Sequence, residues 1–384
     1  MMKKKIQIIS AFLVIALWFS LACVAWLQPA KKISAAERRP LAQMPSFGDG
    51  TEDKPFTDLF DKYTQDQFPL RDTFRQLKSL FHFYTMQQMD NNNYYVLDGY
   101  VTKMLQMGKN QETQLLLNLD VFNTVYNKYV RPFGCKSYVA IVPDKGYYMY
   151  EESGHLAPDY EKLFSLVKEK MPWATHIDLT ELLTLEDFYK TDTHWRQENL
   201  VKVAEKIAEA MKMQVTPLEE YTMELIEKPF YGVYYGHAAL PLPAEKMYHL
   251  HSQILDECTV DKLEPVLDEN GKMTMEFAWS TTPSPIYDLK QLDSEDMYNS
   301  FISPNTLGMV RIKNPNATTG KSLIVFRDSF GSSISPLLVE SYATVTLVDL
   351  RYASSEDLGR YLTFRGDDVL FLFGTQVLME TPLN

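Results

Sequence analysis

Two short segments contain residues whose types and spacing could carry out acyl transfer. Thr191-Asp192-Thr193-His194-Trp195 places a carboxylate two residues before an imidazole, and Phe326-Arg327-Asp328-Ser329-Phe330-Gly331 places a serine just past an apolar run that ends at Phe326. A serine hydroxyl is a poor nucleophile until a base takes its proton, and a carboxylate must hold that base in one tautomer. The sequence therefore supplies one candidate for each position of a catalytic triad: Ser329, His194 and Asp192.

The surroundings of the serine predict a strand that turns into a helix. Leu323-Ile324-Val325-Phe326 is a short apolar strand pattern, and we expect a helix at about residues 333–342. Open α/β sheets bind ligands at the carboxyl ends of their strands, where the N-terminus of the next helix offers N–H groups to a developing oxyanion. The alternative is that Asp328 or Ser329 only caps the helix.

Asp192 and His194 come shortly before an amphipathic helix that we expect at residues 197–211. In an extended segment, residues i and i+2 point to the same face. Asp192 could therefore reach one imidazole nitrogen while His194 presents the other nitrogen to a substrate. The alternative is that His194 is a buried structural histidine beside Trp195.

No other pattern predicts a metal or cofactor site. His249-Leu250-His251 could form a metal-binding pair along a strand, but nothing near it in the sequence completes a site, which favours an ordinary surface strand. HExxH, CxxC and Gly-rich phosphate loops are absent, so we expect no metal and no cofactor. The tyrosines Tyr231, Tyr234 and Tyr235 are compatible both with stacking on sugar rings and with core packing.

The composition limits the class of protein. With 384 residues and 45% hydrophobic residues, the chain can bury a full core in one large or two modest domains. A formal net charge of −12 argues against nucleic acid or an anionic lipid surface as a partner. Cys135 and Cys258 lie beyond the first 30 residues, and we expect them to stay unpaired although a disulfide between them is possible.

The N-terminus predicts a membrane anchor. Lys3, Lys4 and Lys5 precede a stretch from Ile6 to Leu27 that carries no charge and is about as long as the ~20 residues that span a bilayer. The lysines predict a cytoplasmic N-terminus and an extracellular ectodomain. A cleaved signal peptide is the alternative. The expected organisation is a basic tail at 1–5, a transmembrane signal anchor at 6–28, a linker at 29–54 and an ectodomain at 55–384.

Within the ectodomain, helical and strand patterns alternate, which predicts an α/β fold with a mostly parallel sheet. Asp98-Gly99 predicts a hairpin within residues 94–107, and residues 213–318 are expected to be an inserted, mixed β-rich segment. The expected strands are 137–142, 176–179, 323–326, 344–348 and 369–373. The expected helices are 111–130, 158–170, 197–211, 333–342 and 354–362, after helical spacing in residues 55–89 that breaks at Pro69.

Taken together, the two motifs resemble the DHHW protein family. They are also similar to the alginate O-acetylation proteins of the SGNH-hydrolase-like superfamily. The matching segments are Tyr189-Lys190-Thr191-Asp192-Thr193-His194-Trp195 and Phe326-Arg327-Asp328-Ser329-Phe330-Gly331, supported by Gln67-Phe68-Pro69-Leu70-Arg71 and Val348-Asp349-Leu350-Arg351-Tyr352. The resemblance covers about residues 55–375.

The resemblance implies a three-layer α/β fold in a circularly rearranged order, in which the serine follows the Asp/His pair. It implies a triad of Asp192, His194 and Ser329. Thr193 stands at the second position of Asp-His-His-Trp, where its side chain should point away from the site, and Arg327 replaces the glycine of Gly-Asp-Ser. The remaining oxyanion or substrate contacts stay open, and the candidates are Gly232, Asn305, Gln376, Arg327 and Tyr235.

The resemblance also implies a partner and a function. Such proteins are associated with a multi-pass membrane-bound O-acyltransferase that delivers acetyl groups across the bilayer. The implied function is a membrane-anchored O-acetyltransferase or acetylesterase that acts on a cell-surface polysaccharide. The alternative, from another class, is a non-catalytic glycan-binding or scaffold subunit of a polysaccharide acetylation complex.

Overall fold

The computed structural model describes residues 2–302, 308–317 and 319–384. The chain divides into two compact units. The N-terminal unit comprises Met1–Asn92 and Tyr235–Pro241, and the sheet unit comprises Asn93–Tyr234 and Leu242–Asn384. All three residues of the expected triad belong to the sheet unit.

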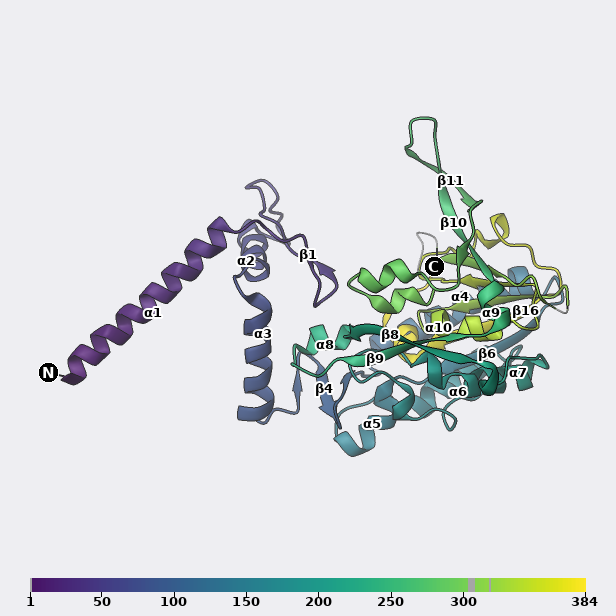
Figure 1. Cartoon of the computed structure of the whole chain (residues 1–384), viewed down its shortest axis with the longest axis horizontal. Helices are drawn as coiled ribbons and strands as arrows, with labels where there is room; N and C mark the ends of the chain where they lie inside the picture. The colour runs from purple at the N-terminus through teal and green to yellow at the C-terminus, as the bar shows by residue number, and fades with distance from the viewer. Residues whose placement is uncertain (1, 303–307, 318) are drawn as a thin grey trace. The chain divides into compact units, whose positions relative to one another are not determined.

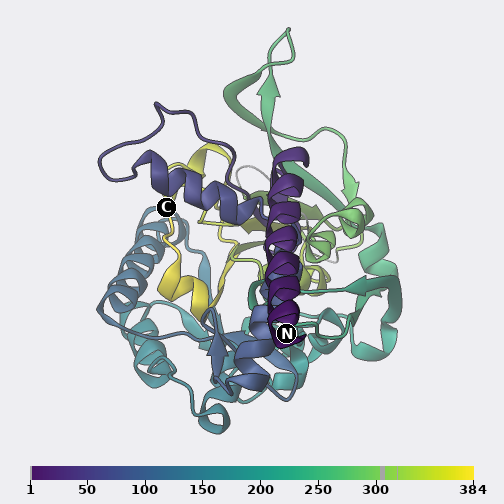
Figure 2. The same ribbon diagram turned by 90° about the vertical axis from the view of Figure 1, so that its left-hand side faces the viewer.

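The N-terminal unit begins with one unbroken helix, α1 (Met2–Leu27), drawn in purple in Figures 1 and 2. Its segment Lys4–Leu27 is long and apolar enough to cross a membrane. The expected helical region breaks around Pro69 into two helices, as its spacing predicts. The other elements are β1 (Ile33–Ser34), β2 (Arg39–Pro40), α2 (Phe56–Asp66), α3 (Arg71–Leu80), a π-helical turn (Phe81–Thr85) and β3 (Asp90–Asn91).

The sheet unit contains most of the predicted strands and helices. Its strands are β4 (Tyr94–Leu97), β5 (Tyr100–Lys103), β6 (Lys136–Val142), β7 (Thr175–Ile177), β8 (Thr222–Phe230), β9 (Glu245–His251), β10 (Thr259–Leu267), β11 (Met273–Trp279), β12 (Ser284–Pro285), β13 (Met309–Lys313), β14 (Ser322–Arg327), β15 (Thr344–Val348) and β16 (Asp368–Gly374). Its helices are α4 (Lys109–Val125), α5 (Lys145–Ser153), α6 (Tyr160–Lys170), α7 (Val201–Met211), α9 (Gln253–Glu257), α10 (Gly331–Ile334) and α11 (Thr375–Glu380); α8 (Val233–Ala238) starts in this unit and ends in the other.

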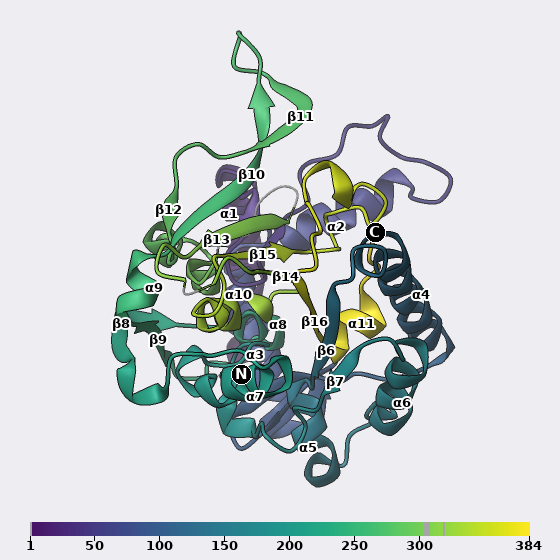
Figure 3. The same cartoon turned by 90° about the vertical axis from the view of Figure 1, so that its right-hand side faces the viewer.

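The main sheet is mixed rather than mostly parallel. Its strand order is β11-β10-β13-β15-β14-β16-β6-β7, with β12 paired to β10. Strands β15, β14, β16, β6 and β7 pair in parallel. Strands β10 to β13 come from the expected inserted segment and extend the same sheet in antiparallel pairing. The hairpin of β10 and β11 projects from the sheet (Figures 1 and 3).

Alternating side chains place a hydrophobic layer on each face of this sheet. On β14, Leu323 and Val325 pack with residues of α7, while Ile324 and Phe326 pack with residues of α4 and α11. Figure 3 shows α4, α6 and α11 together on one side of β6 and β16. The sheet unit is therefore a three-layer α/β structure with a core on both faces of the sheet.

Three expected helices are shorter than their patterns predict. The helix expected at 197–211 begins only at Val201, after a 3₁₀ turn at Gln197–Asn199. After the serine, α10 ends at Ile334 and a 3₁₀ turn follows at Ser335–Leu338, because Pro336 has no N–H to continue an α-helix. Residues 354–362 contain only a 3₁₀ turn, Leu358–Arg360, which has the poor helix former Gly359 at its centre. The expected hairpin around Asp98-Gly99 is present, and both turn residues have positive φ.

Candidate active site

A closed loop positions the Asp-Thr-His segment. Phe188 and Trp195 form an antiparallel bridge, and the Tyr189 N–H donates to the His194 carbonyl at 3.1 Å. At the base of the loop the Arg196 N–H donates to the Asp187 carbonyl at 2.8 Å. Asp192 therefore lies near the tip of a loop whose two arms are joined by backbone hydrogen bonds.

The expected contact between Asp192 and His194 is present. Asp192 Oδ1 lies 2.5 Å from His194 Nδ1 and also accepts the His194 backbone N–H at 3.0 Å. Both side chains are buried, Asp192 completely. Because an ionised carboxylate only accepts hydrogen bonds, Nδ1 carries the proton and Nε2 of a neutral ring presents its lone pair. This is the tautomer that a general base for serine requires.

Residues that follow β8 hold the other side of Asp192. The Val233 N–H donates to Asp192 Oδ2 at 2.8 Å, and the Gly232 N–H donates to Thr191 Oγ1 at 3.1 Å. A Cβ on Gly232 would lie 2.3 Å from both Asp192 Cβ and the Thr191 carbonyl oxygen. Only glycine permits this close approach, so Gly232 is a packing position whose N–H is already engaged, and it is not a free oxyanion donor.

Asp328, rather than Ser329, caps the turn after β14. Its carboxylate accepts the Phe330 N–H at 2.9 Å and the Gly374 N–H at 2.7 Å, which ties the ends of β14 and β16 together. Burial raises the pKa of Asp328, and these two backbone donors oppose the shift. With the capping role taken by Asp328, Ser329 is left partly exposed at the carboxyl end of a parallel strand.

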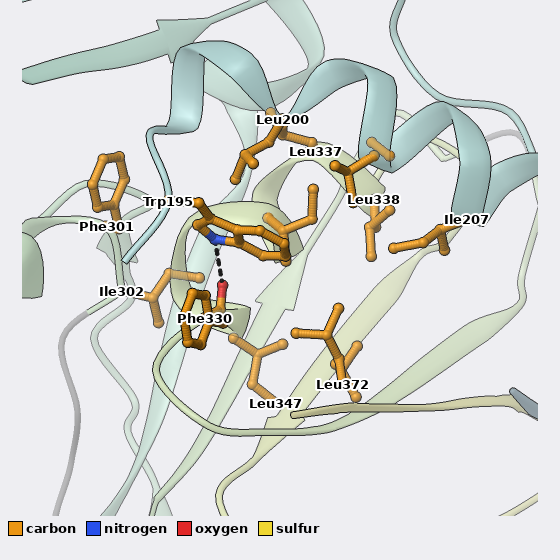
Figure 4. Close-up of a cluster of buried hydrophobic side chains, with 14 of the residues drawn as sticks. Trp195, Leu200, Ile207, Phe301, Ile302, Phe330, Leu337, Leu338, Leu347 and Leu372 are labelled. Atoms are coloured by element: carbon orange, nitrogen blue, oxygen red, sulfur yellow. Dashed lines mark hydrogen bonds between the residues drawn. The ribbon is translucent and has the colours of Figure 1, made fainter. Parts of the chain in front are cut away.

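Trp195 joins the histidine segment to the serine turn. Its Nε1–H donates to the Phe330 carbonyl at 3.1 Å and to Ser333 Oγ at 3.0 Å. Figure 4 shows the indole packed among Leu200, Leu337 and Phe330, with the bond to Phe330 dashed. The indole is fully buried. The tryptophan of the motif therefore fixes the position of the serine turn relative to His194.

Tyr298 makes a second connection between the two segments. Its ring stacks on the His194 imidazole with 3.8 Å between ring centroids, and the Phe330 ring meets the imidazole edge-on at 5.4 Å. The Tyr298 hydroxyl bonds to Ser333 Oγ at 2.7 Å. Burial raises the pKa of Tyr298 well above its ordinary value, so this hydroxyl stays protonated.

The final contact of the expected triad is not formed. His194 Nε2 is buried and has no hydrogen-bond partner in the described part of the chain. Ser329 Oγ therefore does not bond to this nitrogen, although its turn packs against the imidazole. A buried nitrogen without a partner is rare in native structures. Ser329 as nucleophile stays a prediction.

A buried lysine donates hydrogen bonds to the loop that carries Asp192 and His194. Lys145, at the carboxyl end of β6, donates from Nζ to the carbonyls of Tyr189 at 2.9 Å and Lys190 at 3.0 Å. The Glu245 carboxylate accepts the backbone N–H groups of Lys190 and Thr191. Burial lowers the pKa of Lys145 to about 7, and the charges of Asp192, Glu245 and Asp144 oppose the shift.

Replacing Lys145 with methionine should change how stability depends on pH. The folded chain releases the Lys145 proton near pH 7, whereas an unfolded lysine releases it near 10.5. Between these values the unfolded state binds one more proton, so the free energy of unfolding rises with pH, by up to about 1.4 kcal/mol per unit. Lys145→Met should lack this component.

Denaturant unfolding of the full chain at pH 7 to 10 gives the free energy of unfolding of the wild type and of Lys145→Met. The difference between the two, plotted against pH, is the contribution of Lys145. Lys168→Met, at an exposed position on α6, is the matched control and should follow the wild type. Parallel curves for wild type and Lys145→Met would show that Lys145 keeps an ordinary titration.

The remaining candidates have mostly structural contacts. Arg327 is buried and donates to the Asp328 carbonyl and to Ser332 Oγ, both at 3.1 Å, so it braces the serine turn. Gln376 accepts from the Tyr234 hydroxyl at 2.9 Å and donates to Glu380. Tyr235 belongs to the N-terminal unit. Asn305 lies outside the described residues.

Sequence reasoning missed Tyr298, Val233 and Lys145 as parts of this site. Lys145 carried a usable signal, because it follows a predicted parallel strand whose carboxyl end shares an edge with that of β14. Tyr234 was noted only as part of a tyrosine-rich run, yet its hydroxyl donates to Thr193 Oγ1 at 3.0 Å. Nothing in the sequence around Tyr298 predicts its contact with His194.

Neither a protein-family model nor a curated protein matches the sequence. Solved structures do match the fold. A DHHW family protein from Eubacterium siraeum is 18% identical with a TM-score of 0.57, and the match covers 76% of this chain and 93% of that one. PatB1 from Bacillus cereus, with a sulfonyl adduct, is 17% identical with a TM-score of 0.55 and coverages of 74% and 96%. The O-acetyltransferase domain of Pseudomonas putida AlgJ is 14% identical, with a TM-score of 0.42 and coverages of 74% and 91%.

The first two likenesses span nearly the whole length of the solved proteins and about three quarters of this chain. At this level of identity they establish the fold. The resemblance that the two motifs predict is confirmed at that level: the chain has the fold of the DHHW family protein from Eubacterium siraeum and of PatB1.

Proposed function

We propose that this protein is an O-acetyltransferase or acetylesterase that acts on a cell-surface polysaccharide through Ser329, His194 and Asp192. The observation that carries the proposal is the buried Asp192–His194 pair, whose Nε2 has no partner in the described chain and lies beside the serine turn. The acetyl group itself is what the resemblance of the two motifs to the alginate O-acetylation proteins implies.

In the proposed reaction Ser329 Oγ attacks the carbonyl carbon of an acetyl donor, and its proton passes to His194 Nε2. The tetrahedral intermediate expels the leaving alkoxide, which takes the proton from Nε2 and leaves an acetyl-serine. A sugar hydroxyl or water then attacks this ester, its proton passes to Nε2 and on to Ser329 Oγ, and the acetyl group leaves the enzyme. The Nδ1 proton stays on the imidazole throughout, hydrogen-bonded to Asp192, and the carboxylate stabilises the imidazolium that forms in each half of the reaction.

One observation favours a second candidate. The Ser329 hydroxyl does not bond to His194 in the described structure, and the His194 ring is well packed between Tyr298 and Phe330. A non-catalytic glycan-binding or scaffold subunit would need the pair only for packing. Catalytic hydrogen bonds are often long before substrate binds, and turnover of an acetyl ester separates the two candidates.

An assay with a chromogenic acetyl ester tests the proposal directly. The full-length chain in detergent should release the chromophore, and a sulfonyl fluoride should stop turnover and add one sulfonyl group to the peptide that contains Ser329. The probe is chosen because the PatB1 structure holds a sulfonyl adduct. With an added polysaccharide, a transferase yields acetylated glycan and an esterase yields only acetate. Absence of both turnover and labelling would favour the scaffold subunit.

We further propose that a multi-pass membrane-bound O-acyltransferase supplies the acetyl groups. Membrane vesicles that contain both the partner and this chain should then acetylate a polysaccharide on the outer side when an acetyl thioester is supplied on the cytoplasmic side, with the free thiol as the second product. Equal acetylation by vesicles that contain this chain without the partner would contradict this dependence.

The proposed orientation has the N-terminus in the cytoplasm and the residues after α1 outside. Its basis is the lysine cluster before a helix long enough to span a bilayer. Protease added to intact cells should digest the ectodomain and spare a tag at the N-terminus, and permeabilised cells should lose the tag as well. Protection of the whole chain in intact cells would show that the orientation is wrong.

A further inference from the structure

The structure brings a third residue to the histidine pair that the sequence left incomplete. His249 and His251 are two residues apart on β9, so their side chains share one face. In the antiparallel pairing of β8 and β9, Glu224 lies directly opposite His249 and two positions from the partner of His251. One ligand atom from each residue lies within 4.8 Å of the other two. Pairing of the strands therefore gathers two imidazoles and a carboxylate at one place.

Each imidazole is held at one nitrogen by an oxygen outside this group. His251 Nδ1 lies 2.7 Å from Asp256 Oδ1, and its Nε2 faces Glu224 Oε2 at 2.9 Å. His249 Nε2 lies 2.9 Å from Ser300 Oγ. Metal-binding histidines typically donate one ring N–H to such an oxygen, which orients the ring and leaves the second nitrogen for the ion.

The second nitrogen of His249 lacks a partner. His249 is fully buried, and its Nδ1 has no hydrogen-bond partner among the described residues. The Tyr287 ring stacks on His249 at 4.1 Å and meets His251 edge-on at 5.3 Å, so both rings are fixed in orientation. A buried polar atom left without a partner destabilises the folded state. A cation bound at Nδ1 would satisfy this atom.

We propose that Glu224, His249 and His251 bind a divalent transition-metal ion such as Zn²⁺. Two imidazoles and one carboxylate are a donor set suited to that ion, with the fourth position open to water. Ligands of one Zn²⁺ stand roughly 3–3.5 Å apart. The exposed Glu224 carboxylate, which already lies 2.9 Å from His251 Nε2, can shift toward His249. Asp256 and Ser300 orient the two rings. The bound ion would cross-link β8 and β9. The site lies close to Gln197, whose side chain accepts the Leu250 N–H.

Titration of the chelator-treated full chain with Zn²⁺ tests the site without any assay of activity. Calorimetry should give one ion per chain, and Co²⁺ should produce the visible absorption of a bound ion. Glu224→Gln and His251→Gln should each weaken Zn²⁺ binding at least about tenfold, and Asp256→Asn by about 10- to 100-fold. Mg²⁺ should not compete, because it prefers oxygen ligands.

Glu227→Gln is the matched control, because Glu227 is an exposed carboxylate on the same strand outside the site. Wild-type affinity in this control together with weakened binding in Glu224→Gln and His251→Gln supports the site. Equal affinity in the wild type, the control and all three site variants, or no stoichiometric binding by the wild type, would overturn it. His251 would then only bridge Glu224 and Asp256 through hydrogen bonds.

Discussion

Ser329→Ala should lower acetyl-ester turnover on the order of 10⁴-fold or more and abolish labelling by a sulfonyl fluoride. The reason is that alanine has no atom that can form the acyl-enzyme, so only binding and backbone electrostatics remain. Ser329 is partly exposed and its neighbour Asp328 carries the capping hydrogen bonds. The free energy of unfolding should therefore change by no more than about 1 kcal/mol.

Ser332→Ala is the matched control, because this serine lies three residues further along the same turn. Its hydroxyl accepts from Arg327, which still donates to the Asp328 carbonyl in the variant, so Ser332→Ala should lose some stability while keeping labelling and most of its turnover. Initial rates and intact-protein mass spectrometry measure both effects. A folded Ser329→Ala protein with full activity would assign the chain to the non-catalytic class.

Asp192→Asn should lower kcat by about 10⁴-fold while the loop keeps its shape. The carboxylate accepts from His194 Nδ1, the His194 N–H and the Val233 N–H. An amide in its place can donate to Nδ1, which moves the ring proton to Nε2 and removes the base that faces the serine. The double variant with Ser329→Ala should be no slower than Ser329→Ala alone, because the three groups act as one unit.

Asp268→Asn, in the turn between β10 and β11, serves as the control for the loss of one negative charge. It should leave kcat unchanged. If Asp192→Asn kept more than about a tenth of wild-type kcat, Asp192 would be a packing residue and the base would need another source of orientation.

Local features of this protein were predictable from the sequence. The contact between Asp192 and His194 depends on their spacing of two residues, and the strand before Ser329 depends on a run of four apolar residues. The span of α1, the hairpin at Asp98-Gly99 and the strands at the sheet centre have the same local origin. The early end of α10 was also predictable from Pro336, although the spacing of apolar residues indicated a longer helix.

The tertiary structure alone decided which distant residues meet. Val233 and Gly232 contact the Asp192 segment across about forty residues of chain, Tyr298 stacks on His194, and Glu224 joins His249 and His251 through strand pairing. The antiparallel half of the main sheet was likewise unforeseen, because periodicity shows that a segment is a strand and not which strand it pairs with. Propensity and side-chain periodicity act over a few residues, whereas these contacts are selected by burial and packing of the whole sheet unit.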